Sequence, residues 1–357
     1  MSTDTMQSSL LFDRRVTQES GFTLVELLVS VAIGLLGIVV MFQVMSVGES
    51  LKRTTAAGSD SQIAGTVAMF SLEGDVRPAG LGFGRGVDST AVPSLGCTVS
   101  AKGSTASFLM VPVLIAQGAG GAPDTITTLY GNSSLFVSTQ KFKAATNSTK
   151  TVDGSYGGFR VGDVVVAGGA GSGTACEMFQ VSSDATPGTL GHATVATFNP
   201  APVQIAYTSG FLYNLGSNPQ RNVWSIQNGQ LMMRDSLRSA NAIEVADNII
   251  DLQAEYGVDG FGGGNATDGQ LEDGDWTATT PANWSRLLAV RVALLSRSQQ
   301  FEKTEVTPNA PEWSGGAFVM SDIAGAPGDT ANWKRYRYRV YEKVIPLRNM
   351  VWGGDFN

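Results

Sequence analysis

The stretch GFTLVELLVSVAIGLLGIVVMF, residues 21–42, decides the fold of the N-terminal part of the chain. From Phe22 to Phe42 the only formally charged side chain is that of Glu26. A helix of this length rises about 30 Å, which is enough to cross the hydrocarbon core of a bilayer. A carboxylate within such a span is costly, so it normally has a partner and a purpose. The stretch predicts one membrane-spanning helix with a functional glutamate near its start.

Basic and small residues lie directly upstream of this apolar stretch. Arg14 and Arg15 supply positive charge, and Gly21 precedes the first apolar residue. Residues 1–21 therefore resemble the leader of type IV prepilins and type II secretion pseudopilins, in which glutamate is the fifth residue after the glycine. The resemblance implies that a prepilin peptidase cuts between Gly21 and Phe22 and methylates the new α-amine of Phe22. An ordinary signal anchor is the alternative, but it requires neither the glycine nor the glutamate at this spacing.

The same resemblance implies a role for Glu26 and a location for the chain. When apolar helices leave lipid and pack into a filament, a lone carboxylate would be buried without water, and a neighbouring subunit's α-amine would compensate it. We therefore expect Glu26 to act in subunit assembly. The implied location is the bacterial inner membrane, crossed once, with the leader cytoplasmic and the C-terminal domain periplasmic, and then the pilus at the cell surface. The implied partners are other minor and major pilins, the prepilin peptidase and inner-membrane lipid.

The helix is predicted to continue beyond the apolar stretch. No proline occurs from Gly48 to Val76, whereas Pro78 and the glycines after it end the pattern. Ile63, Val67 and Phe70 recur at helical spacing and Leu72 and Val76 extend the apolar face, so we expect an amphipathic segment that packs this face on the following domain. The predicted organisation is a leader at 1–21, a membrane or filament-core helix at 22–44, its amphipathic continuation at 45–77, and a β-rich domain at 78–357.

A short motif at the end of this predicted helix narrows the family. Leu72, Asp75, Arg77, Ala79 and Gly80 match a stretch of PilW-like minor pilins, as do segments at 251–259, 289–295 and 347–349. The resemblance implies an α+β, type IV pilin-like fold, in which one long helix packs on a domain of mainly antiparallel strands. It implies a minor pilin that takes part in type IV pilus assembly, in a priming or tip complex. J-class type II secretion pseudopilins share this layout, so a secretion role is one alternative.

Strand patterns dominate the rest of the chain. Asn228-Gly229 between two apolar runs is a strong hairpin signal. Residues 242–248 are predicted as a short helix. Residues 287–296 and 335–344 alternate apolar and polar side chains, which predicts one buried and one wet sheet face for each.

Composition excludes several classes of protein. The net charge of −7 offers no electrostatic footprint for nucleic acid, so no nucleic-acid partner is expected. The two cysteines, Cys97 and Cys176, belong to no CxxC motif or Cys/His cluster, which makes zinc unlikely on pattern grounds. Because the domain is expected outside the inner membrane, we predict a Cys97–Cys176 disulfide, with two buried thiols as the alternative.

Catalytic or metal chemistry has little support, and the chain is not expected to be an enzyme. The one histidine, His192, lies in a turn-like stretch and is predicted to be in a surface loop. The acidic loop at 259–275 gives weak calcium candidates, although position 12 of an EF-hand starting there would be Gln270 and not glutamate. A solvated acidic loop is the alternative, and no cofactor is expected. The calcium candidates are Asp259, Asp268, Asp273 and Asp275.

A second class of function is a binding module. In this alternative the chain is a pilus-tip adhesin for cell adhesion, with the central region recognising a surface or glycan. Tyr207, Phe211, Tyr213 and Trp224 are aromatic residues that line such a site or, at strand positions, belong to the core.

Overall fold

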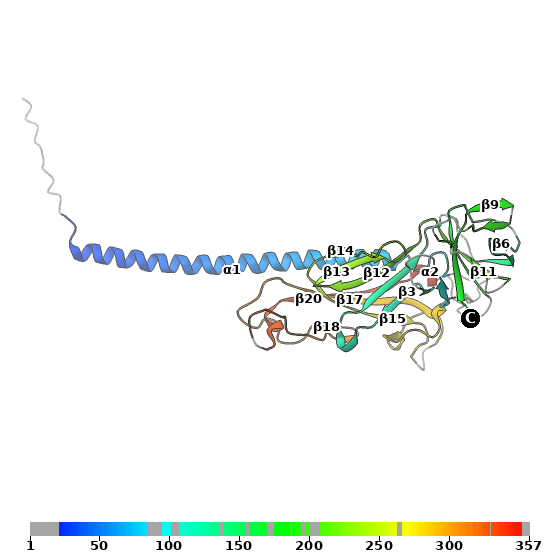
Figure 1. Cartoon of the computed structure of the whole chain (residues 1–357). Coiled ribbons are helices and arrows are strands. Elements are labelled where there is room, and N and C mark those ends of the chain that lie inside the picture. Colours follow the sequence, from blue (N-terminus) through cyan, green and yellow to red (C-terminus); the bar gives the residue numbers. More distant parts are fainter. Residues whose placement is uncertain are drawn as a thin grey trace, which may run out of the picture. The chain divides into compact units, whose positions relative to one another are not determined.

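The computed structural model describes residues 21–84, 95–100, 107–133, 135, 139–154, 157–169, 175–186, 188–193, 198–199, 208–262, 266–328 and 330–351. The leader residues 1–20 and Tyr207 lie outside these ranges. The chain divides into two compact units, residues 1–55 and 56–357. Helix α1 (Leu24–Val76) begins in the first unit and ends in the second (Figure 1).

The second unit is built around β-sheets. One sheet has the order β2 (Phe108–Leu109), β1 (Thr98–Ser100), β8 (Ala175–Gln180), β7 (Val164–Gly168), β11 (Gly210–Gly216), β5 (Gln140–Ala145), β6 (Thr149–Val152), β10 (Thr189–Gly191) and β9 (Ser183–Thr186). Another has the order β14 (Ile243–Ala246), β13 (Gln230–Asp235), β12 (Gln220–Gln227), β4 (Thr125–Tyr130) and β3 (Val113–Ala116). A third has the order β16 (Trp276–Thr277), β15 (Ile249–Val258), β17 (Leu287–Arg297) and β20 (Tyr338–Pro346), and β18 (Glu312–Trp313) pairs with β19 (Gly316–Ala317).

The helical elements after α1 are short. They are η1 (Ala119–Gly121), η2 (Asp273–Asp275), η3 (Trp284–Arg286), η4 (Asn332–Arg335) and α2 (Arg348–Val351). Strand pairing is antiparallel throughout the described residues except between β1 and β8. The predicted α+β fold, with a long apolar N-terminal helix and a β-rich C-terminal domain, is confirmed.

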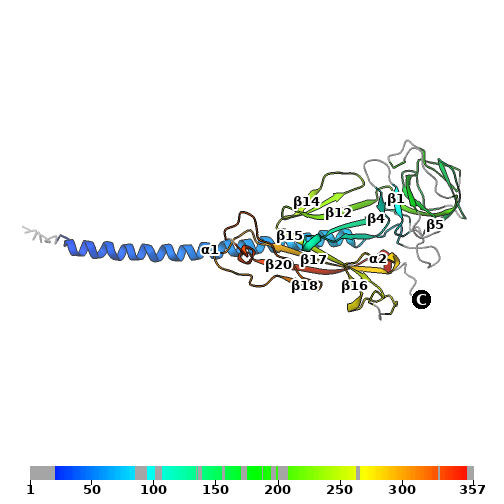
Figure 2. The same ribbon diagram turned by 60° about the horizontal axis from the view of Figure 1, so that its bottom comes forward.

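Two of the sheets share one hydrophobic core with the end of the helix. Ala68, Met69, Leu72 and Val76 of α1 pack in the same cluster as Ile126 and Trp224 of one sheet and Leu252, Val290 and Ile345 of the other. In Figure 2 the strands β4 and β12 and the strands β17 and β20 appear as separate layers. The core therefore lies between two sheets and is closed by one face of the helix.

The packed face of the helix is the predicted one only at Leu72 and Val76, which are fully buried in the core. Ile63, Val67 and Phe70 are 60%, 45% and 75% exposed, so the expectation that they pack on the domain is wrong. The buried residues, with Ala68 and Leu72 among them, lie on the opposite side. Both faces are apolar over this segment, so helical periodicity could not determine which one faces the core.

Small residues let the third sheet approach the helix closely. A side chain at Gly65 would overlap the ring of Tyr341 on β20, because a Cβ there would lie 2.0 Å from its Cε2 atom. The Tyr341 hydroxyl donates to the Gln62 carbonyl at 3.2 Å. Ser61 and Ser296 of β17 share a buried hydroxyl contact of 2.5 Å. Glycine at 65 is therefore needed for close approach of the sheet.

Asp75 connects the last turn of the helix to the five-stranded sheet. Its carboxylate accepts hydrogen bonds from Thr128 Oγ1 at 2.7 Å and Tyr130 Oη at 2.6 Å, both on β4. Asn222 Nδ2 and Trp224 Nε1 of β12 each donate at 2.6 Å. The donors lie two residues apart on neighbouring strands, so they share one sheet face. Four donors for one buried carboxylate satisfy it without a counter-ion.

The nine-stranded sheet closes on itself. Strands β8 and β9 are separated by only two residues, yet β8 is third in the sheet order and β9 is last. The Ser182 amide between them donates to the Gly191 carbonyl of β10 at 2.8 Å. The segment from β8 through Ser182 to β9 therefore pairs with β7 on one side and with β10 on the other. It closes β7, β11, β5, β6 and β10 into a ring, which we call the curled sheet. Its interior is an apolar cluster that includes Phe142, Phe179 and Leu212.

The predicted disulfide is confirmed. Cys97 and Cys176 are bonded, with their Cα atoms 5.8 Å apart. Cys176 and Met178 of β8 face a second apolar cluster outside the curled sheet, whereas Phe179 faces its interior. Val164 to Ala167 of β7 are fully buried because both faces of this strand are covered.

Three polar residues lie inside the curled sheet. Lys150 of β6 is fully buried, and its Nζ atom lies 3.5 Å from Oε2 of Glu177 on β8. His192 is 1% exposed and packs against Phe179 with ring centroids 4.7 Å apart, so the prediction of a surface-loop histidine is wrong. His192 follows β10 directly and lies two residues after Leu190, so both side chains face the interior. The turn-like sequence did not indicate this strand.

Two further sequence predictions need correction. Residues 242–248 contain strand β14 and no helix, because pairing with β13 overrides local propensity. Strand β17 is buried on both faces and not on one, since Val290, Val292 and Leu294 face the core beneath the helix, whereas Ala293 and Leu295 pack with Phe318 on the other face. The predicted Asn228-Gly229 hairpin is confirmed as the turn between β12 and β13, and both turn residues have positive φ.

The Asp75 contacts predict a large loss of stability on substitution. Asp75→Ala would leave four buried donors without their acceptor, so we expect a loss of about 3–5 kcal/mol. Asp153→Ala is the matched control, because Asp153 is a half-exposed partner of Lys143 at 3.8 Å and should cost less than about 1 kcal/mol. Thermal unfolding of the detergent-solubilised full chain, followed by circular dichroism, measures both. Equal losses for the two variants would contradict the assigned role of Asp75.

His192 predicts a dependence of stability on pH. Burial, followed by the charge of Lys150, lowers the pKa of His192 from 6.5 to about 4. Below pH 6.5 His192 is protonated in the unfolded chain but stays neutral in the folded chain. The free energy of unfolding therefore falls by up to about 3 kcal/mol as the pH approaches 4. His192→Phe should lose less stability over this range, as measured by urea denaturation midpoints. If the urea midpoint of His192→Phe fell with pH as steeply as that of the unaltered chain, the role of His192 would be refuted.

Candidate functional site

The start of α1 carries the predicted assembly glutamate. Thr23 precedes the first helical residue, and its Oγ1 accepts the Glu26 amide at 3.3 Å. Thr23 and Glu26 thus have the Thr-x-x-Glu spacing of a capping box. A carboxylate in the first turn is also favoured by the helix dipole. Gly21, Phe22 and Glu26 are exposed in this single chain, so the surface that includes them is open to another molecule.

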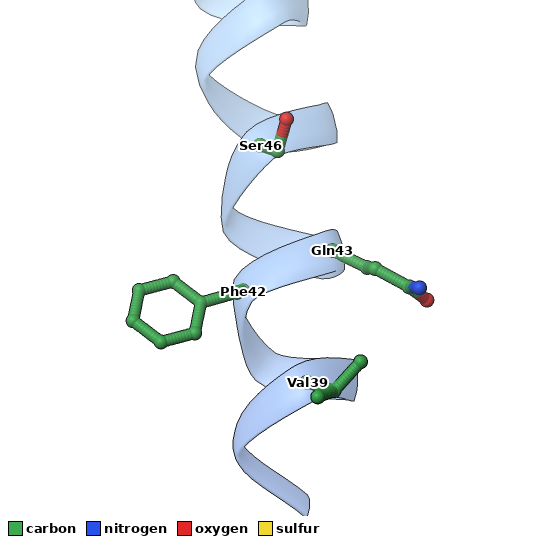
Figure 3. A pocket seen from close by; sticks show the side chains of 4 residues that line it. All are labelled: Val39, Phe42, Gln43 and Ser46. Carbon is green, nitrogen blue, oxygen red and sulfur yellow. The ribbon is translucent and has the colours of Figure 1, made fainter. Parts of the chain in front are cut away.

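The apolar part of the helix is exposed along its whole length. Leu24–Ser46 is long and apolar enough to cross a membrane, and it is uncovered in the first unit. Val39, Phe42, Gln43 and Ser46 line a shallow hollow on this helix (Figure 3), with Phe42 and Gln43 projecting in different directions. Side chains of one helix alone form it, so it does not enclose a small molecule. This surface fits lipid or the helices of other subunits.

An apolar stripe occupies the exposed face of the helix in the second unit. It consists of Ile63, Val67 and Phe70, and it is here called the helix stripe. A side chain at Gly74, one turn further on, would meet no atom within 4 Å, which shows that this face is open. Contiguous exposed apolar groups of this kind mark interaction surfaces. The stripe lies on an element fixed by Asp75 and by the core, so it is a rigid surface.

Glu73 ties the same helix end to the third sheet. Lys343 Nζ of β20 donates to its Oε2 atom at 2.5 Å, and Arg77 forms an ion pair with its other oxygen. The hydrogen bond from Lys343, aided by the charges of Lys343 and Arg77, holds the pKa of the Glu73 carboxyl below its usual value. Arg77 therefore pairs with Glu73 at i, i+4 and not with Asp75, in agreement with the spacing in the sequence motif.

The acidic loop uses its carboxylates to hold its own backbone. Asp259 accepts the amides of Asp268 and Gly269 at 3.3 and 3.1 Å. Asp275 accepts the Phe261 amide at 3.0 Å and the Glu272 amide at 3.1 Å. Across the part of the chain that the structure describes, no three His, Cys, Asp or Glu side chains gather as metal ligands. The weak calcium candidates, Asp273 included, are thus not assembled into such a group.

The aromatic residues considered for ligand binding are mainly core residues. Tyr213 is fully buried in the cluster outside the curled sheet, and Trp224 is buried beside the helix, where it donates to Asp75. Phe211 is partly buried against the same cluster as Tyr213. These three side chains therefore support packing, and they do not form an exposed aromatic surface.

Comparison with known families gives two matches. Residues 17–42 match the prokaryotic N-terminal methylation motif, and residues 213–349 match the type IV pilus-assembly protein W family. The second match begins within β11 and ends within α2, so it covers the third sheet and strands β12 to β14 of the five-stranded sheet but not β3 and β4. No curated protein and no solved structure gives a match.

The two matches occur in the expected order and agree with the fold. The methylation motif covers Gly21, Phe22 and Glu26 at the exposed start of α1, which fits a membrane-anchored pilin. The family match covers Asn222, Trp224 and Lys343, which hold the end of the helix. Together the two matches support a PilW-like minor pilin of the type IV pilus.

Proposed function

We propose that this minor pilin joins other minor pilins in a complex that primes filament assembly or stands at the filament tip. The observation that carries the proposal is the helix stripe, Ile63, Val67 and Phe70, which stays uncovered although the opposite face of the same helix is buried in the core. Apolar groups exposed on a rigid helix are stabilised when another subunit covers them.

The site proposed for subunit contact has two parts, each within its own unit. One is the apolar segment with Glu26 near its start, and the other is the helix stripe. In lipid, helices associate through close packing and polar pairs because lipid gives no hydrophobic drive between them. Outside lipid, burial of the helix stripe supplies that drive at about 25 cal/mol per Å² of apolar surface. The two parts therefore serve assembly before and after the helix leaves the membrane.

Processing belongs to the same proposal. Cleavage between Gly21 and Phe22 by a prepilin peptidase, followed by methylation of the Phe22 amine, is supported by the methylation motif and by the exposure of both residues. The leader lies in the cytoplasm and the C-terminal domain in the periplasm, from which the chain passes to the pilus surface. The methylated amine keeps its positive charge, so it can pair with Glu26 of a neighbouring subunit.

The role of Glu26 gives one prediction. Glu26→Gln removes the charge but keeps the size of the side chain, so membrane insertion and cleavage after Gly21 should be unchanged. Recovery of the other minor pilins with the detergent-extracted full chain should fall at least tenfold, because a buried amine is left without its carboxylate. Glu49→Gln is the matched control and should co-purify normally. Normal recovery and normal piliation with Glu26→Gln would exclude an assembly role.

The helix stripe gives a second prediction. Val67→Asp places a charge on the stripe, and Val161→Asp places one on an equally apolar but separate exposed position of the second unit. Both variants should fold, since both valines are exposed, and equal thermal unfolding temperatures check this. Only Val67→Asp should reduce piliation and co-purification of partner pilins, because the charge would be buried in the subunit contact. Equal piliation in the two strains would rule out the helix stripe as a contact.

A further inference from the structure

The interior of the curled sheet holds a lysine and a glutamate that the assembly function does not use. Lys150 lies on β6 and Glu177 on β8, with three strands between them in the sheet order. They meet because the sheet closes on itself, so their side chains cross its interior. The side chain of Lys150 is fully buried and that of Glu177 is 12% exposed. A pair this far from solvent needs a physical explanation.

The distance between the two side chains is suited to a reaction. Lys150 Nζ and Glu177 Oε2 are 3.5 Å apart, which is longer than a charge-assisted hydrogen bond and places the amine directly beside the carboxyl group that it would attack. Both residues are fixed by strands on opposite walls of the interior. Such positioning replaces the encounter of two separate molecules and raises the effective concentration of the reacting groups greatly.

The surroundings favour the neutral form of the Lys150 amine. Burial lowers the pKa of Lys150, although the charge of Glu177 opposes this. The Nζ atom of Lys150 lies 5.9 Å from the centroid of the Phe142 ring and 5.8 Å from that of Phe179, in an interior where the lysine is fully buried. His192 beside them is neutral at pH 7 because burial lowers its pKa to about 4. A neutral amine is therefore more accessible here than in water.

We propose that Lys150 and Glu177 form an intramolecular isopeptide bond across the curled sheet. The lone pair of the neutral Lys150 amine attacks Cδ of the protonated Glu177 carboxyl. A new C–N bond forms and one C–O bond breaks. The amine gives up one proton to the leaving hydroxyl, and one water is released. No oxidant, reductant or cofactor is needed, because amine and acid condense to amide and water.

The bond would complement the disulfide on the same strand. Cys176 and Glu177 are neighbours on β8 and face opposite sides of the sheet. Cys176 is joined to β1 outside the curled sheet, and Glu177 would be joined to β6 inside it. Strand β8 would then carry a covalent link on each face. An amide is not broken by reducing agents, so this second link would persist where the first is lost.

The test is the mass of the protein after the disulfide has been reduced. The full-length chain, extracted from membranes in detergent, should weigh less than its processed sequence by the mass of one water. After trypsin, residues 144–160 should be found joined to residues 161–221, because an amide at Lys150 blocks cleavage there. A water loss located on a single linear peptide, or no water loss at all, would overturn the proposal.

Two variants locate the bond. Lys150→Met keeps the length and apolar character of the buried chain but has no amine, so the water loss should vanish. Lys143→Met is the control, since Lys143 is an exposed residue of β5 that pairs with Asp153, and it should keep the water loss. The measurement on the unaltered chain decides the proposal even if Lys150→Met fails to fold. A retained water loss in Lys150→Met would show that the bond is elsewhere.

Discussion

One buried carboxylate determines how the helix and the sheets of the second unit are held together. Asp75 accepts four hydrogen bonds from two strands, and no cation is among its donors. A charge buried in this way is tolerated only where all of its donors are in place, so the positions of β4 and β12 and the end of α1 depend on one another. Glu73 adds a second attachment to β20. The outward face of the helix is rigid as a result, and another subunit can bind a rigid face with a smaller loss of conformational entropy.

Sequence patterns predicted the elements whose causes are local. The apolar run from Phe22 to Phe42, the Asn228-Gly229 turn and the end of the helix before Pro78 each follow from the residues themselves. The choice of the buried helix face was wrong at Ile63, Val67 and Phe70 because both faces are apolar and only Tyr341 and the sheets decide between them. Similarly, His192 carries no local sign of burial, since its burial depends on the pairing of β10 with the distant strand β6 as well as with the neighbouring β9.

The candidate contact surface was only partly predictable. Glu26 was identified from its spacing after Gly21, and the structure adds its capping partner Thr23. The sequence also singled out the residues of the helix stripe, but it predicted that they face the core, whereas they are exposed. The Lys150–Glu177 pair could not be found at all, because the two residues lie in unrelated strands that meet only when the sheet closes. The family match begins at residue 213, so the curled sheet lies outside it except for the last residues of β11.

The position of Asp75 in the chain also constrains the order of synthesis and folding. Two of its donors, Asn222 and Trp224, follow it by 147 and 149 residues. Until they emerge, the last helical turn carries two carboxylates and no basic residue, an arrangement that the helix dipole disfavours. In a nascent chain the helix should therefore fray at this end. Its last turn becomes stable only after strands that are made much later have supplied their donors.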